Sequence, residues 1–269
     1  MNEYVVLKNE YLTLKISHKG ASVVEVSDND GNILLSGGPT ILFPVCGGVY
    51  GDAVTIGGNE YEINDDGFAK DSEFMLLECY EDYAEFILSS DDDTVEKYPF
   101  SFNIFVSYKL LGKAFEINCR AGNFSEYKMP YSLGINTYFP YESLNAQFCR
   151  DEIMEGYILK NGLFCGEVKR VMPQNGKSLD IPENSEFVIK NIISDSFKLT
   201  KDGRMLAKVQ AENLSGFSVR SVQGGMCVGM WQGFAGTFGK KEDFITKEGA
   251  RLVDENSSDE YSFLISFNI

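Results

Sequence analysis

The chain has 269 residues, 43% of them apolar, and a formal net charge of −16 from 24 basic and 40 acidic side chains. This length can bury a large core, and so acidic a surface repels phosphate backbones and anionic lipids, so we expect neither nucleic acid nor a membrane as a partner. The opening segment MNEYVVLKNEYLTLKI resembles no signal peptide, and no apolar run reaches membrane-spanning length. We therefore expect a soluble, cytoplasmic protein that is a monomer or a homodimer.

Alternation of apolar and polar residues dominates the chain from its first segment to its last. Residues 11–17 (YLTLKIS), 100–110 (FSFNIFVSYKL) and 261–269 (YSFLISFNI) each place apolar side chains on one face and polar side chains on the other. The segments EFVIKNI and GFSVRSV show the same alternation more weakly. A period of two is typical of half-buried antiparallel strands.

Clusters of turn-forming residues separate these segments. They are Asn29–Asn32, Gly57–Asn59, Asp91–Asp93 and Lys201–Gly203. No segment of a dozen residues has a helical stripe, and only short helical turns are expected, near residues 71–74 and 240–249. The sequence therefore predicts an all-β protein, with a single domain over residues 1–269 built as a large antiparallel β-sandwich.

A single histidine, His18, limits the chemistry open to this chain. It excludes a histidine pair and a histidine-rich zinc site, and no GxSxG motif exists to supply a Ser-His-Asp triad. We expect His18 to be a structural or surface residue. The six cysteines have no metal-ligand spacing, so free thiols and no metal are expected. The glycine-rich segments CGGVYG and QGGMCVG indicate tight turns, because neither is a Walker motif.

Two segments carry side chains suited to a sugar site. In INDDGFAKDSEF (63–74), the carboxylates of Asp65 and Asp66 precede Gly67. In CVGMWQGFAG, Trp231 is followed by Gln232, and an aromatic face can stack on a sugar while an amide binds its hydroxyls. The alternatives are an ordinary acidic turn for the first segment and core packing of the tryptophan for the second.

Five segments, in order, carry one pattern that extends over essentially the whole chain. They are ISHKGASVVEVSDNDGNILLSGGPTILFPVCGGV, YEINDDGFAKDSEF, YPFSFNIFVSYKL, MPYSLGINTYF, and MCVGMWQGFAG followed by KEG. This pattern resembles the aldose 1-epimerase (galactose mutarotase-like) family, in particular its small bacterial subgroup associated with lactose operons. The resemblance implies a twisted β-supersandwich with a sugar cleft on one face, and a reaction that needs neither a metal nor an organic cofactor.

The resemblance also implies four functional positions, at which this chain differs. In the family, a histidine protonates the pyranose ring oxygen, a glutamate takes the proton of the anomeric hydroxyl, and a second histidine and an arginine hold the sugar. Here Asp66 and Asn136 stand at the histidine positions, Gly229 at the glutamate position and Gly48 at the arginine position. Lys70 replaces a further arginine, which keeps the charge but loses the two-pronged hydrogen-bond geometry.

The first hypothesis is therefore a carbohydrate-binding relative of the mutarotases whose acid and base residues have been replaced. Its candidate ligand is a monosaccharide or another small carbohydrate, and its candidate binding residues are Asp66, Lys70, Asn136, Trp231 and Gln232. Phosphorylated sugars are not expected, because the cationic anchor is missing and the protein is acidic.

A second hypothesis is a working aldose 1-epimerase with carboxylate-based catalysis. Asp66 is its candidate catalytic residue, since repulsion from the adjacent Asp65 would favour a protonated carboxyl. Glu142, Glu242 and Asp243 are the candidates for the missing base. A third hypothesis is a structural or partner-binding relative with a vestigial cleft.

Overall fold

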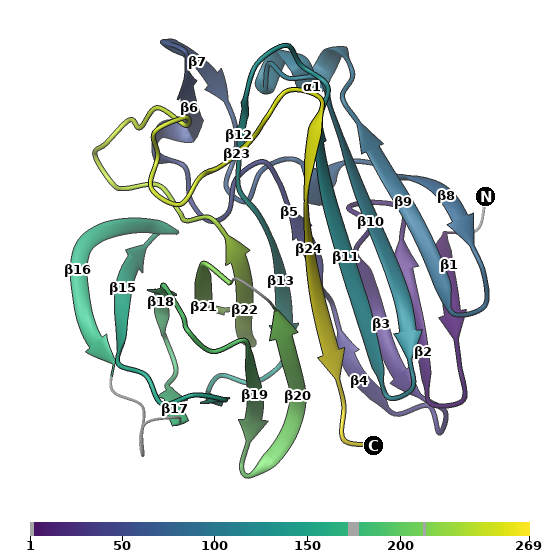
Figure 1. Cartoon of the computed structure of the whole chain (residues 1–269). Helices are drawn as coiled ribbons and strands as arrows, with labels where there is room; N and C mark the ends of the chain where they lie inside the picture. The colour runs from purple at the N-terminus through teal and green to yellow at the C-terminus, as the bar shows by residue number, and fades with distance from the viewer. Residues whose placement is uncertain (1–2, 172–177, 212–213) are drawn as a thin grey trace.

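The structure, a computed structural model, describes residues 3–171, 178–211 and 214–269. Two large sheets dominate it, and every strand pair within a sheet is antiparallel (Figure 1). This confirms the predicted all-β antiparallel sandwich.

The larger sheet has nine strands and the second has seven. The spatial order of the nine is β17 (Ser178–Ile181), β14 (Leu144–Phe148), β19 (Ser196–Lys201), β20 (Arg204–Ala211), β24 (Ser257–Ser266), β11 (Ala114–Asn123), β10 (Phe102–Leu111), β9 (Tyr83–Ser89) and β8 (Met75–Cys79). The order of the seven is β16 (Leu163–Val171), β15 (Met154–Lys160), β18 (Glu186–Lys190), β21 (Gly216–Val222), β22 (Gly225–Gln232), β13 (Leu133–Phe139) and β5 (Thr40–Leu42).

Three smaller sheets complete the fold. A four-stranded sheet contains β1 (Tyr4–Lys8), β2 (Leu12–Ser17), β3 (Val23–Asp28) and β4 (Ile33–Ser36). The two two-stranded sheets are β6 (Ala53–Ile56) with β7 (Asn59–Glu62), and β12 (Met129–Tyr131) with β23 (Arg251–Val253).

The buried core follows directly from the alternation in the sequence. In β10, the side chains of Phe102, Ile104, Val106, Tyr108 and Leu110 are buried, whereas the residues between them are half-buried or exposed. One buried apolar cluster includes residues from β1 to the end of the chain. Because successive side chains of a strand point to opposite faces, a single pattern selects both the core and the outer surface.

The large sheet is covered by different partners along its length (Figure 1). Behind its β8–β11 half lies the four-stranded sheet, and the hydroxyl of Tyr108 donates to the carbonyl of Ala21 across this layer at 2.6 Å. The seven-stranded sheet packs against the other half, where the ring of Phe217 lies 5.5 Å from that of Phe148 and 5.0 Å from that of Phe197.

The helices are few and short. The turn η2 (Ala69–Asp71) lies close to the helical turn expected near residues 71–74, but residues 240–249 form turns without a helix. Asp91–Asp93, expected to be a turn, instead begins α1 (Asp92–Lys97), because the Asp91 carboxylate accepts a hydrogen bond from the Thr94 amide and caps the helix. A third short turn is η1 (Tyr50–Asp52). None of the helices in the described ranges is both long and apolar enough to cross a membrane.

Four connections meet against one face of the seven-stranded sheet and position the site. Backbone hydrogen bonds join them: the Gly48 amide donates to Gly162 at 3.0 Å, the Gly236 amide donates to Gly48 at 2.7 Å, and the Asp66 amide donates to Gly47 at 2.9 Å. The glycines allow this close approach, because a Cβ at Gly48 would lie 2.7 Å from the backbone of Gly162.

Candidate functional site

The candidate site lies where β13, β22, β21 and β18 run side by side. Their antiparallel register places Asn136 and Ser218 opposite Gly229, and places Cys227 and Glu186 opposite Arg220. Side chains that are opposite one another in neighbouring strands point to the same face and lie close together. This face, the connection after β5 and the turn between β15 and β16 form a small pocket. It is lined by Gly47, Asn136, Leu159, Gly162, Ser218, Val219, Arg220, Cys227 and Trp231.

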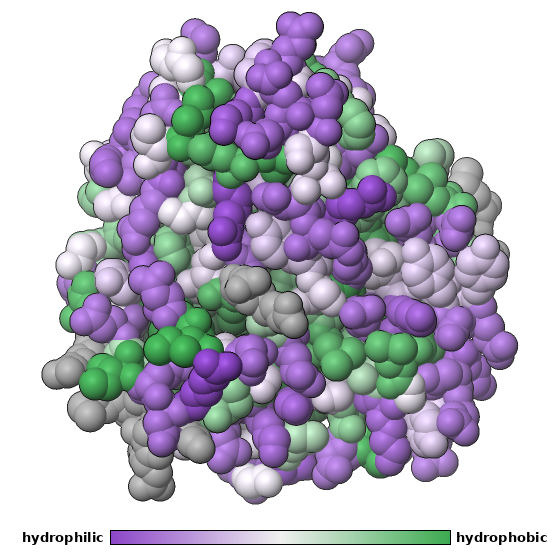
Figure 2. All heavy atoms as spheres, viewed as in Figure 1, coloured by the Kyte–Doolittle hydropathy of each residue, from purple (hydrophilic) through white to green (hydrophobic). Residues whose placement is uncertain are grey.

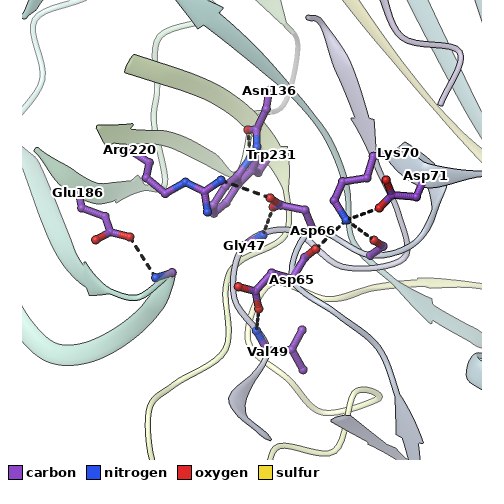
Figure 3. A network of polar contacts seen from close by, with 12 residues as sticks. Gly47, Val49, Asp65, Asp66, Lys70, Asp71, Asn136, Glu186, Arg220 and Trp231 are labelled. Carbon is purple, nitrogen blue, oxygen red and sulfur yellow. Dashed lines mark hydrogen bonds and ion pairs between the residues drawn. The ribbon is translucent and has the colours of Figure 1, made fainter. Parts of the chain in front are cut away.

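Trp231 and Asn136 form a hydrogen bond across this face. The Trp231 indole nitrogen donates to the Asn136 Oδ1 at 3.0 Å, and the indole is only 4% exposed (Figure 3). Glycines make room for the ring, because a Cβ at Gly47 or Gly134 would lie 3.0 or 2.8 Å from it. The ring therefore serves mainly as core, and little of its face is available for the sugar stacking expected from the sequence.

Gly229 lies directly beneath this hydrogen bond. A Cβ there would lie 2.3 Å from the Asn136 Oδ1, 2.5 Å from the Trp231 Nε1 and 2.2 Å from the Ser218 Oγ. Real Cβ atoms essentially never approach heavy atoms so closely. The position at which the family resemblance implies a glutamate base is thus filled by the side chains of its neighbours.

Asp66 is buried at the mouth of the pocket, with an exposed fraction of 6%. Its backbone has a φ of 62°, which aspartate tolerates better than most residues, and Gly67 must follow because a Cβ there would lie 2.1 Å from the Phe43 carbonyl oxygen. One carboxylate oxygen accepts from the Gly47 amide at 2.8 Å, and the other lies 3.7 Å from Arg220 Nη2 (Figure 3). The geometry favours a fixed acceptor over a mobile proton carrier.

Arg220, from β21, is the residue that sequence analysis missed. Its side chain is 37% exposed, and the 3.7 Å contact with Asp66 is its only ion pair among the described residues. A guanidinium has five donor N–H groups, and Arg220 is among the lining residues of the pocket. The alternation of GFSVRSV already placed Ser218 and Arg220 on one face. What the sequence did not provide was the register that brings this face to Asp66.

Asp65 and Glu186 add two carboxylates near the arginine. The Asp65 Oδ1 accepts from the Val49 amide at 2.8 Å, and the Glu186 Oε1 accepts from the Gly162 amide at 3.0 Å (Figure 3). Burial raises the pKa of Asp65 above its usual 3.8, with further contributions from the charges of Asp66 and Asp52, whereas the hydrogen bond from Val49 opposes the shift. The raised pKa favours the protonated form of this carboxyl.

We expect Asp65→Asn to raise the melting temperature at pH 7. Because the pKa of Asp65 is raised in the folded protein, the native state holds the proton more tightly than the unfolded chain. Between the pKa of this carboxyl in the unfolded chain and its higher pKa in the folded protein, the free energy of unfolding falls as the pH rises. Above both pKa values, the charged carboxylate therefore destabilises the folded protein. Asparagine keeps the acceptor for Val49 and removes the charge.

Thermal unfolding between pH 4 and 8 measures this effect, and the gain should shrink toward about pH 4, where aspartate carboxyls take up protons. The matched control is Asp52→Asn, which removes an exposed carboxylate near by. Equal gains from both substitutions, or no gain from Asp65→Asn, would contradict the burial argument.

Lys70 supports the Asp66 turn from outside the pocket. Its ammonium donates to the carbonyls of Asp65 at 3.1 Å and Gly67 at 2.8 Å, and lies 3.0 Å from the Asp71 carboxylate (Figure 3). These contacts direct its charge to the backbone of the turn. We therefore reassign it from binding residue to positioning residue.

Gln232 lies on the opposite face of β22 from Trp231. It is fully buried, and its Oε1 accepts from the hydroxyl of Ser215 at 3.0 Å and from Arg251 Nη2 at 2.8 Å. Adjacent residues of a strand point to opposite faces. The expectation that Trp231 and Gln232 bind one ligand together is thus corrected, and Gln232 leaves the candidate site.

The three carboxylates suggested as replacement bases lie elsewhere. Glu142 is exposed in the connection between β13 and β14, Glu242 pairs with Lys240 at 2.9 Å, and the Asp243 carboxylate accepts from the Ile245 amide at 2.9 Å. None of them is among the lining residues of the pocket. Asp65 and Glu186 are the carboxylates that the fold brings to its rim.

The described part of the chain lacks the arrangement that a metal site requires. No group of three or more His, Cys, Asp or Glu side chains there is arranged to hold a metal ion. All six cysteines are free. His18 lies away from the pocket, where its ring packs edge-on against Phe86 with the ring centres 5.8 Å apart.

This architecture is that of the galactose mutarotase-like proteins. A galactose mutarotase-like protein from Lactobacillus casei superimposes with a TM-score of 0.91 at 16% identity, with 98% of this chain and all of that chain covered. A galactose mutarotase related enzyme from Lactobacillus acidophilus gives 0.87 at 18% identity, with 99% and 97% covered.

Sequence similarity identifies the family to which the chain belongs. The aldose 1-epimerase family matches residues 3–261, so the chain belongs to this family. The plasmid-encoded protein LacX of Lactococcus lactis subsp. lactis is 26% identical over 237 residues, which cover 82% of this chain and 77% of LacX. The predicted family and its subgroup are thus confirmed.

Proposed function

We propose that this protein binds a small neutral carbohydrate at the pocket between β21, β22 and the Asp66 turn, and that it does not interconvert the anomers of its ligand. The family supports a carbohydrate-related role. Arg220 supplies several donors and Asp66 a fixed acceptor, and their nearest atoms are 3.7 Å apart. Such a pair suits neighbouring hydroxyls, each of which can accept from the guanidinium and donate to the carboxylate.

One observation carries the second half of the proposal. The Asn136–Trp231 hydrogen bond closes over Gly229, so no titratable side chain stands at the histidine position occupied by Asn136 or at the glutamate position occupied by Gly229. An amide and an indole N–H can hold a hydroxyl but do not exchange protons near neutral pH. A general acid and a general base are the groups that opening a pyranose ring requires.

The size of the pocket determines how a ligand enters. About 10 Å³ is available to the centre of a water molecule, which is room for roughly one water. Backbone hydrogen bonds hold Gly47 to Asp66 and Gly162 to Gly48, whereas Arg220 is long and partly exposed. A pyranose therefore binds only after the Arg220 side chain turns outward, and the guanidinium then closes onto the hydroxyls.

Optical rotation tests the absence of catalysis. Freshly dissolved α-galactose or α-glucose should reach anomeric equilibrium at the same rate with and without the protein. Acceleration in proportion to the amount of protein, which persists after the protein is purified from a different host, would contradict the proposal.

Restoring the family's glutamate should not restore activity. We expect Gly229→Glu to destabilise the protein, because the new side chain must displace Asn136, Trp231 and Ser218, and overpacking typically costs about 1–3 kcal/mol. Urea unfolding and polarimetry check both points. A control is Gly229→Gln, which overpacks the same space with a side chain that cannot act as a base. A stable Gly229→Glu variant with mutarotase activity would show that the position is open.

A carboxylate-based epimerase is the second candidate, and one observation favours it. The pKa of Asp65 is raised by burial, which makes this carboxyl the candidate proton donor, and its Oδ2 lies near Gly162, whose amide donates to the Glu186 carboxylate. If polarimetry shows acceleration, Asp65→Asn should remove it while Asp52→Asn should not. Acceleration that survives both Asp65→Asn and Glu186→Gln would eliminate this candidate.

A further inference from the structure

Among the described residues, no strand pairs with the outer side of the edge strand β8. It is the last strand of the nine-stranded sheet, so every second residue turns its N–H and C=O away from the sheet. Its sequence MLLEC contains neither lysine nor proline, the residues that commonly block such edges. The strand is irregular only at the register shift between Leu76 and Glu78.

Apolar side chains on this edge are exposed to solvent. Met75 is 62% exposed, Leu77 41% and Tyr80 62%. Figure 2 shows apolar surface over the β8–β9 edge, on the right of the view. Contiguous apolar surface beside unpaired backbone is typical of an interaction site.

A groove runs along the edge between β8 and β1. It has a volume of about 870 Å³, and its lining includes Tyr4, Val6, His18, Phe74, Met75 and Cys79. β1 is itself the edge of the four-stranded sheet. The two edges converge where the Lys8 amide donates to the Glu81 carbonyl at 2.8 Å. At the other end, the Phe74 amide donates to the His18 carbonyl at 2.9 Å. The groove is therefore flanked by two strand edges and bounded at both ends by backbone hydrogen bonds.

Charge decides which kind of partner fits. Glu73, Glu78, Glu81 and Asp82 are exposed along this edge, and none of them has a salt bridge within the described residues. A second copy of the chain pairing antiparallel about Leu77 would place Glu73 opposite Glu81 of its partner, and like charges in that arrangement are destabilising. A cationic segment would instead neutralise these carboxylates.

We propose that β8 is a docking edge for an extended segment of a partner protein, apolar at alternate positions and basic between them. The segment adds a strand to the nine-stranded sheet through backbone hydrogen bonds, while its apolar side chains enter the groove. Its lysines or arginines face the carboxylates that border β8. This surface is separate from the carbohydrate pocket, so the inference stands whether or not the pocket binds a sugar.

Fluorescence anisotropy with a labelled octapeptide of alternating valine and lysine tests the proposal on the full chain. The peptide should bind saturably, and more weakly as salt is raised. A glutamate-for-lysine peptide should not bind, and neither should a lysine peptide with two valines replaced by proline, which keeps the charge but cannot form a strand. Equal binding of the proline peptide would overturn the proposal, as would no binding of the parent peptide.

A pair of variants places the binding on β8. Met75→Lys with Leu77→Lys should weaken binding by about tenfold or more, equivalent to roughly 1.4 kcal/mol. The matched control, Ile153→Lys with Ile193→Lys, changes the charge equally at two other exposed apolar residues and should bind more tightly than the first pair. Circular dichroism verifies that both fold. Equal effects of the two pairs, or sedimentation showing a dimer that only the β8 variant dissolves, would overturn the proposal.

Discussion

Replacing Arg220 by alanine is expected to weaken carbohydrate binding by roughly 10- to 150-fold, the equivalent of losing about 1.5–3 kcal/mol from hydrogen bonds to a charged group. The folded protein should tolerate the change, because the side chain is 37% exposed and has one ion pair, at 3.7 Å. The substitution therefore lowers the affinity for the ligand and leaves the fold intact, because the guanidinium donates its hydrogen bonds to the ligand.

Arg220→Lys separates charge from shape. Lysine keeps the positive charge but cannot donate from two parallel N–H groups, so binding should be intermediate. Calorimetric titration gives the affinities, and thermal unfolding verifies the fold. Tighter binding by Arg220→Ala would contradict the account, because it would mean that the arginine only obstructs the pocket.

Trp231→Ala is expected to lower the free energy of unfolding by about 3–5 kcal/mol, the usual cost of removing a buried tryptophan side chain. The indole is 4% exposed and fills the space left by Gly47, Gly134 and Ala235. Its loss leaves a cavity, and leaves the Asn136 Oδ1 without its donor.

Trp231→Phe measures the contribution of the N–H group, because it keeps most of the ring and should cost about 1–3 kcal/mol from the unpaired amide. Urea unfolding followed by far-ultraviolet circular dichroism gives both values, since the chain has no other tryptophan to report by fluorescence. A loss below about 1 kcal/mol for Trp231→Ala would show that the tryptophan is not part of the core.

The fold was predictable because its dominant signal is local. The alternation in residues 100–110 and 261–269 identified β10 and β24 and their buried faces. Helix α1 was missed, since a run of aspartates is common to turns and helix N-termini, and only the Asp91–Thr94 contact distinguishes the two. The single domain over residues 1–269 stays a prediction.

The site was predictable in part, for reasons of geometry. Asp66, Asn136 and Trp231 do converge, as their places in the family pattern suggested. Strand alternation alone already separated Trp231 from Gln232, because neighbours in a strand face opposite ways. Arg220 needed the register of β21 with β18 and β22, which depends on long-range pairing and is not contained in any short segment.

The small size of the pocket could not be predicted from the sequence. It depends on sub-ångström contacts at Gly229 and on where one long side chain comes to rest. Composition and periodicity do not determine either of these.

Isothermal titration calorimetry with a panel of neutral aldoses and small oligosaccharides tests the central claim most directly. The account predicts that at least one neutral sugar binds saturably at millimolar concentration or below, and that Arg220→Ala loses this binding. No binding of any sugar at millimolar concentration, or equal binding by wild type and Arg220→Ala, would contradict it.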